Sequence, residues 1–262
     1  MTRTKSTFLA LAAVLLTPMV ANADTIWLTH GDGTRVGTVD SSTGAGTDVG
    51  AQGFSQSWAA AFGTDGTLYT TVNGFSGNAR LATVDQSTGA ATVIGSGLGT
   101  SMISLEVSSS GQMYGVGYND QILYSIDSAT GAATAIGSTG IGAMMDLAFD
   151  ASGTLWGTVS NRLSTIDLLT GASTFVATIT GGASNVMSLM FDSSDTMLVS
   201  EYLNGARLFS VDSSTGISSL IGATGLNIVH GGDIYIAVPE PGTLALFGIG
   251  LFGMGLARRK KV

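Results

Sequence analysis

Residues 24–237 are predicted to form an all-β fold, a five-bladed β-propeller of four-stranded blades closed by its C-terminal strand. Three observations predict this fold: a repeated phrase, four strand patterns in each repeat, and a repeat divided between the two ends of the region. The repeated sequence motif contains D-x-x-T-G, and its five copies recur at intervals of 40 to 45 residues, the period of propeller blades. Its aspartates are Asp40, Asp85, Asp127, Asp167 and Asp212.

The repeat that contains Asp167 illustrates the four strand patterns in order. The first strand is predicted at 144–150, and a Ser-Gly turn leads to the second strand at 154–159. A short loop precedes the third strand at 162–167, and the Thr-Gly turn of the phrase leads to the fourth at 173–178. In that turn an aspartate accepts hydrogen bonds from backbone N–H groups and a glycine adopts positive φ. We therefore expect the five aspartates to be turn residues, not metal ligands or catalytic groups.

The first blade is divided between the two ends of the repeat region. Residues 25–29 (TIWLT) align with a second strand, so the region begins inside a repeat. Residues 231–237 (GGDIYIA) align with the first strand at 144–150, which places Asp233 at the position of Asp146. The last strand is therefore expected to complete the first blade and to remove the exposed sheet edges of an open ring.

Residues 1–23 have the pattern of a secretory signal peptide. Arg3 and Lys5 precede an apolar run at 8–16, and the small residues Ala21–Ala23 form an A-x-A cleavage site. The run is too short for a membrane anchor. The sequence therefore predicts export through the Sec pathway.

The C-terminal segment contains Gly248-x-Gly250-x-x-Gly253, which formally matches a dinucleotide-binding fingerprint. That fingerprint requires an acidic residue about 20 positions later, and the printed sequence ends nine residues after the last glycine. An uncharged run at 243–257 precedes the cations Arg258–Lys261. As a helix the run would span about 22 Å, so we expect a short transmembrane helix with its cations on the cytoplasmic side.

Residues 238–262 resemble a PEP-CTERM sorting signal. The resemblance rests on Pro239, Glu240 and Pro241, the glycine-containing apolar segment and the terminal Arg/Lys cluster. It implies that an exosortase in the bacterial inner membrane recognises the motif and removes the tail. The protein would then be anchored transiently in the inner membrane before it reaches the cell surface or the extracellular space. Carriers of such tails are typically Gram-negative bacteria that make extracellular polysaccharide.

The charge distribution limits the partners of the repeat region. Residues 24–237 contain 17 acidic residues, four arginines and no lysine, a formal charge of −13. Such a charge excludes nucleic acids and anionic membrane surfaces as partners. The chain has no cysteine, which excludes disulfides and thiolate metal sites. No metal-binding motif is recognised, and no metal site is predicted.

The D-x-x-T-G phrase also resembles the quinoprotein propeller repeat. That family carries a docking tryptophan in most blades, usually has eight blades, and holds its cofactor with a wide set of residues. The three tryptophans here lie at two different repeat positions, Trp27 and Trp156 on second strands and Trp58 on a first strand. The tryptophans therefore do not follow the quinoprotein pattern of one docking tryptophan in most blades, and no cofactor is predicted.

Four arginines share one repeat position, five residues before the repeat aspartate. They are Arg35, Arg80, Arg162 and Arg207. The adjacent loops carry polar side chains, among them Asn161 and Asn204. One interpretation is a ring that binds hydroxyl-rich ligands such as glycans. The other is that the arginine stems pack between blades and the asparagines stabilise turns.

First strands are expected to line the central channel, where Asp146, Asp233 and Glu106 are candidate functional acids. Two such carboxylates would supply an acid and a base for glycoside chemistry. Alternatively, the acids accept hydrogen bonds from backbone groups or trapped water in a polar channel.

These features predict an exported propeller of the cell surface or extracellular matrix in an exopolysaccharide-producing bacterium. We expect a structural or glycan-interaction role without enzymatic activity, with exosortase and extracellular polysaccharide as partners. The alternative is a polysaccharide-active enzyme, a glycoside hydrolase or lyase, on the same fold.

Overall fold

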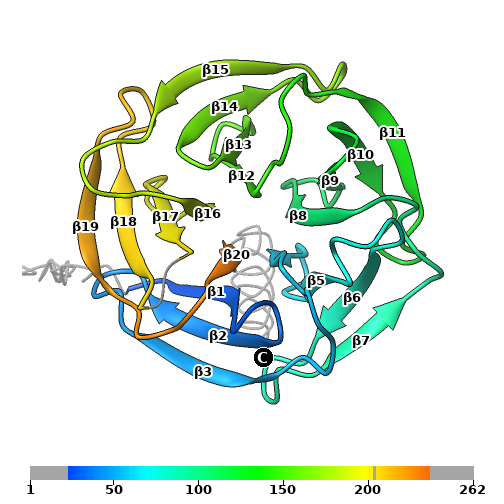
Figure 1. Ribbon diagram of the computed structural model, residues 1–262, viewed down its shortest axis with the longest axis horizontal. Helices are drawn as coiled ribbons and strands as arrows, with labels where there is room; N and C mark the ends of the chain where they lie inside the picture. Colours follow the sequence, from blue (N-terminus) through cyan, green and yellow to red (C-terminus); the bar gives the residue numbers. More distant parts are fainter. Residues whose placement is uncertain (1–22, 203–204, 237–262) are drawn as a thin grey trace, which may run out of the picture.

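The computed structural model describes residues 23–202 and 205–236, which form a ring of five four-stranded antiparallel sheets (Figure 1). The predicted signal peptide, apart from Ala23, and the predicted transmembrane run 243–257 lie outside the described residues, as do Asn204 and Pro239–Pro241. Within the described ranges, no helix has the length and apolar character needed to cross a bilayer.

The strands of each blade are given from the channel outward. Blade A contains β20 (His230–Ile234), β1 (Thr25–His30), β2 (Arg35–Asp40) and β3 (Gly46–Ala51). Blade B contains β4 (Ala61–Phe62), β5 (Leu68–Val72), β6 (Arg80–Val84) and β7 (Ala91–Ile94). Blade C contains β8 (Met102–Val107), β9 (Met113–Gly117), β10 (Ile122–Ile126) and β11 (Ala133–Ser138). Blade D contains β12 (Asp146–Phe149), β13 (Leu155–Val159), β14 (Arg162–Ile166) and β15 (Ser173–Thr178). Blade E contains β16 (Val186–Phe191), β17 (Met197–Glu201), β18 (Arg207–Val211) and β19 (Ser218–Ala223).

Closure of the ring is achieved by β20, which pairs antiparallel with β1. Figure 1 shows this last strand beside the first one, at the inner edge of blade A. Blade A therefore combines strands from both ends of the body, and its four-stranded sheet matches the other four. The predicted five-bladed propeller and its closure by the C-terminal strand are confirmed.

One alignment inside this closure was wrong. Asp233 pairs with Trp27, whereas Asp146 pairs with Thr158 and Ala148 pairs with Trp156. Because the two tryptophans occupy the same position on their second strands, Asp233 corresponds to Ala148 and not to Asp146. A strand has a side-chain period of two, so a shift of two residues keeps every side chain on its face and leaves the alternation unchanged. The alternation in GGDIYIA was therefore unable to distinguish the two alignments.

The repeat aspartates form the hairpin turns between third and fourth strands, as predicted. In the first copy, Asp40 Oδ1 accepts hydrogen bonds from the backbone N–H groups of Ser42 (3.0 Å) and Thr43 (2.8 Å). The N–H of Gly44 donates to the carbonyl oxygen of Asp40 at 2.8 Å, with φ of 75° at the glycine. The other four copies repeat the pattern.

Neighbouring blades meet where each hairpin turn lies against the fourth strand of the preceding blade. The carbonyl oxygen of Thr170 in blade D lies so close to Gly137 of blade C that a Cβ at that glycine would be only 2.0 Å away. The turn of blade B makes the same approach to blade A, with Thr88 against Gly50. We call this the turn–glycine contact. It requires a residue without a side chain on the fourth strand.

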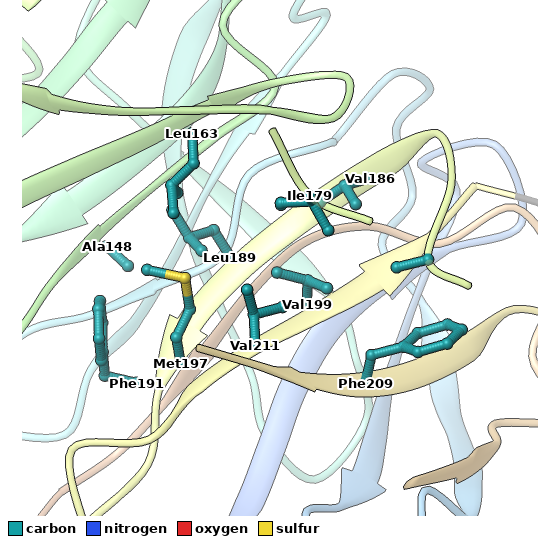
Figure 2. Packing of buried hydrophobic residues seen from close by; sticks show 11 residues of the cluster. Ala148, Leu163, Ile179, Val186, Leu189, Phe191, Met197, Val199, Phe209 and Val211 are labelled. Atoms are coloured by element: carbon teal, nitrogen blue, oxygen red, sulfur yellow. The ribbon is translucent and has the colours of Figure 1, made fainter. Parts of the chain in front are cut away.

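The hydrophobic core lies between blades. Between blades D and E, Ala148 and Leu163 pack against apolar side chains from β16, β17 and β18, including Met197 and Val199 (Figure 2). Second strands are thus buried on both faces, and every residue of β17 is buried. The outer strands β3, β11, β15 and β19 are mostly exposed.

Replacement of Gly137 by alanine is expected to destabilise the ring by about 1–3 kcal/mol, because the new methyl group overlaps backbone of the next blade. Gly77 is the matched control, since nothing lies within 4 Å of a Cβ there and its φ is not in the left-handed region. Gly77→Ala should change the free energy of unfolding by less than about 0.5 kcal/mol. Urea denaturation of both variants measures the difference. Equal stabilities would refute the requirement for glycine at this contact.

Candidate functional site

The ring has two faces with different chemistry. In each antiparallel blade, the loop between the second and third strands and the turn between the first and second strands lie at opposite ends. We call the first end the arginine face, because Arg35, Arg80, Arg162 and Arg207 begin third strands there. We call the opposite end the pocket face.

On the arginine face, two of the four arginines form ion pairs inside their own blades. Arg35 makes a two-pronged contact with Asp48 on β3, with an Nε–Oδ1 distance of 2.8 Å. The same carboxylate lies 3.0 Å from Nε2 of His30. Hydrogen bonding by the guanidinium holds the pKa of Asp48 below its usual range.

Arg207 pairs with Glu201 through Nε at 2.7 Å and Nη2 at 2.8 Å. Glu201 is completely buried, and it also accepts a hydrogen bond from the N–H of Ser184 at 2.9 Å. Ser184 belongs to the connection between blades D and E. The ion pair therefore joins β17, β18 and that connection.

The other two arginines also rest on their own blades. Arg80 donates from Nη2 to the carbonyl oxygen of Gly95 at 3.1 Å, and the Arg162 guanidinium lies 4.5 Å from the centre of the Phe175 ring. Asn161 donates to the carbonyl oxygens of Ile179 and Ala183 in the interblade connection. The arginines thus contact their own blades, whereas the packing interpretation expected their stems between blades. The ligand ring of arginines and asparagines stays a prediction.

Asp146 is a buried carboxyl group that cross-links three blades at the axis. Its Oδ2 accepts hydrogen bonds from the N–H of Leu189 in blade E at 3.0 Å and from the N–H of Gly232 in blade A at 3.1 Å. Burial raises its pKa well above the ordinary value. The side chain therefore joins the inner strands of blades D, E and A.

Glu106 and Asp233 lie at one level of the channel, nearer the pocket face. Glu106 pairs with Tyr114 and Asp233 with Trp27, which occupy equivalent positions on their second strands. Asp233 Oδ2 accepts a hydrogen bond from the N–H of Phe62 at 2.6 Å, which joins blades A and B. Burial raises the pKa of both carboxyl groups, that of Asp233 to about 7, and the charge of Asp233 further raises the pKa of Glu106.

These two acids line a central cavity of about 330 Å³ on the pocket face, to which all five blades contribute. Asp146 is not among its lining residues. The three predicted channel acids are thus separated: Glu106 and Asp233 face the cavity, and Asp146 lies deeper in the axis.

Five aromatic rings form a continuous arc on the arginine face, across blades E, A, B and C. We call them the aromatic arc: Tyr202, His230, Trp58, Phe75 and Tyr118. Trp58 stacks on His230 with ring centres 3.6 Å apart, and the remaining neighbours meet edge to face at 4.2 to 5.1 Å. Burial lowers the pKa of His230 to about 3, so this imidazole is neutral.

Sequence reasoning did not identify the aromatic arc. A signal was present, because Tyr118 and Tyr202 both directly follow the second strands of their blades. Alignment of the repeats at this loop position would have drawn attention to the two tyrosines. Their contact through Trp58 and His230 depends on ring closure, which local sequence does not display.

No metal centre is evident in the part of the chain that the structure describes: no three histidine or acidic side chains gather there closely enough to hold an ion.

The C-terminal segment matches a protein-family model described as the PEP-CTERM protein-sorting motif, over residues 237–261. The chain carries a PEP-CTERM sorting motif. The motif implies an exported cell-surface protein that is processed by exosortase. The match includes Pro239, Glu240 and Pro241 together with the terminal cations.

Solved structures share the fold at low sequence identity. A symmetrical protein from work on de novo evolutionary emergence has 20% identity and a TM-score of 0.56, covering 80% of this chain and 97% of that one. A chain of a nidogen/laminin complex has 10% identity and a TM-score of 0.53, covering 81% and 98%. A structural genomics protein of unknown function from Bacteroides thetaiotaomicron has 16% identity and a TM-score of 0.56, covering 83% and 66%. At these identities the similarity concerns the fold alone. No curated protein matches the chain in sequence.

Replacement of Asp146 by leucine is expected to cost about 2–5 kcal/mol, because two buried N–H groups lose their acceptor. Asp146→Asn retains a carbonyl oxygen as acceptor and should cost clearly less. Thermal and urea denaturation of both variants test this axial cross-link. Identical losses for leucine and asparagine would show that the hydrogen bonds contribute little.

Replacement of Arg207 by alanine is expected to cost about 3 kcal/mol, because Glu201 would be left buried without its cation. Arg162→Ala is the control, since that exposed side chain only covers Phe175, and it should cost less than about 1 kcal/mol. The double variant with Glu201→Gln should recover part of the loss. If the double variant is no more stable than Arg207→Ala alone, the unpaired charge of Glu201 is not the cause of the loss of stability.

Proposed function

We propose that this propeller is a non-catalytic glycan-binding protein of the cell surface or extracellular matrix, and that the aromatic arc is its binding surface. The single observation behind the proposal is the unbroken series of rings across four blades. His230 within this series is buried, and the other four rings are partly exposed. Exposed rings spread over blades E, B and C suit a chain of sugars better than one small molecule.

The chemistry of the arc supports a neutral, hydroxyl-rich ligand. Aromatic rings provide rigid apolar area, and tyrosine hydroxyls both donate and accept hydrogen bonds. Trp58, Phe75, Tyr118 and Tyr202 are all partly exposed. Arg35 and Arg207 are engaged by carboxylates of the protein, which weakens the attraction of this face for acidic polysaccharide.

The position of the arc also supports the proposal. Ile236, the last residue described before the sorting motif, lines the cavity on the pocket face. The arc lies on the opposite face, so the segment that bears the sorting motif starts away from it. A glycan on the arc would therefore not compete with exosortase for access to the tail.

The test measures binding of neutral exopolysaccharide to the purified protein by isothermal titration calorimetry. Tyr118→Ala combined with Tyr202→Ala is expected to weaken binding about tenfold or more, because two ring surfaces are lost. The unfolding temperature should change little, since both rings are partly exposed. The phenylalanine variants should retain most of the affinity. The control is Phe175→Ala, which removes an exposed aromatic ring outside the arc. Unchanged affinity in the double alanine variant would refute the proposal.

A polysaccharide-active enzyme is the second candidate function, and the observation that favours it is the pair Glu106 and Asp233 in one cavity. Raised pKa values allow one such carboxyl group to act as an acid at neutral pH. Release of reducing ends or unsaturated sugars from a glycan panel, lost in Glu106→Gln, would support this function. Absence of turnover together with binding that depends on the arc would favour the non-catalytic role.

A further inference from the structure

The cavity on the pocket face combines carboxyl groups with an aromatic wall. Its lining includes Phe62, Phe149, Phe191 and Tyr235, which come from four different blades. Among the described residues that line it, none is a lysine, arginine or histidine. The acidic and aromatic side chains of the interior therefore favour a cation that carries an apolar group over an anion.

Glu106 has an unused acceptor in this cavity. The side chain is only 6% exposed, and its Oε1 accepts a hydrogen bond from the N–H of Val107 at 3.0 Å. No hydrogen bond to Oε2 is found within residues 23–202 and 205–236, and this oxygen is not one of the fully buried atoms without a partner, so it is accessible from the cavity. Asp233 differs, since each of its oxygens already accepts a backbone N–H. Because Oε2 is accessible and receives no hydrogen bond from the described residues, it is available to a ligand that donates hydrogen bonds.

We propose that the cavity binds a small organic cation through its primary ammonium group, which donates hydrogen bonds to Glu106 and is attracted by Asp233. An ammonium group carries three N–H donors, so it supplies what Oε2 lacks. Aromatic faces attract ammonium ions and also cover the apolar part of the ligand. A volume of about 330 Å³ admits a small amine and excludes a polymer chain. This site is independent of the glycan surface on the other face.

Binding is coupled to proton release. Buried carboxyl groups without a cation retain protons near neutral pH, and the pKa of Asp233 is raised to about 7. The groups around the pair are also acidic: Asp146 in the axis, and Asp150, Asp192 and Asp195 in the turns at the rim. Tyr235 adds a phenol to the lining. No cationic side chain lines the cavity among the described residues to favour ionisation, so an incoming ammonium ion displaces the proton. Affinity therefore rises with pH as the carboxyl groups ionise, for Asp233 around pH 7.

The experiment titrates butylammonium into the full chain in non-ionic detergent by isothermal titration calorimetry at pH 8, with 1-butanol as the uncharged probe. The wild-type protein should bind butylammonium and not 1-butanol. Glu106→Gln keeps the shape of the side chain and should weaken binding about tenfold or more, the effect of losing a charge-assisted hydrogen bond. Asp85→Asn removes one exposed carboxylate that does not line the cavity and should change affinity less than twofold.

The pH profile of the wild-type protein keeps the proposal testable even if Glu106→Gln does not fold. Affinity should be weaker at pH 5.5 than at pH 8, and titrations in buffers of different ionisation enthalpy should reveal proton release. Equal binding of 1-butanol, an unchanged affinity in Glu106→Gln, or the absence of binding at pH 8 would each overturn the proposal.

Discussion

The turn–glycine contact sets the geometry on which the rest of the molecule depends. Each D-x-x-T-G hairpin brings backbone of one blade against backbone of the preceding blade, with no side chain between them. Four of the five interfaces place a threonine carbonyl against a glycine, with Gly50, Gly95, Gly137 and Gly222 as the receiving residues. The contact at Gly222 joins blade E to blade A, so ring closure uses the same contact as the other interfaces. Such close approach sets the distance between neighbouring blades at four of the five interfaces.

The interface between blades D and E shows how the ring accommodates an exception. Ala177 stands where blade C has Gly137, since each pairs with the leucine of its third strand. The methyl group of Ala177 prevents the turn of blade E from making the turn–glycine contact at this position. Gly216 of blade E instead contacts the carbonyl oxygen of Thr178, and Thr180 forms an isolated bridge with Ile217. The large apolar cluster of Figure 2 fills the same interface. Backbone bridging and side-chain packing thus replace one turn–glycine contact without opening the ring.

Much of this architecture was predictable because it is repeated. The spacing of the aspartates gave the number of blades, and the divided first repeat indicated its closure. The hydrogen bonds of Asp40 and the other repeat aspartates connect residues close together in the sequence, so the hairpin turns were predictable from the sequence alone. The position of Asp233 along the channel was not predictable, since the alternation of buried and exposed side chains in a strand stays the same after a shift of two residues. Nor was the aromatic arc, because Trp58 and His230 lie in different blades and meet only when the ring closes. Partners such as Asp48 for Arg35 lie on the next strand, where their pairing depends on the register.

A five-bladed ring has a narrow axis, and this narrowness separates its two faces. Inner strands of blades that are not neighbours come into contact, as β20 does with both β8 and β12. Asp146 uses this proximity to accept hydrogen bonds from the backbone of two other blades, at a position deeper in the axis than the cavity. One face carries the aromatic arc, and the other carries the acidic cavity. A narrow ring thus places two different chemistries on opposite faces of one small body.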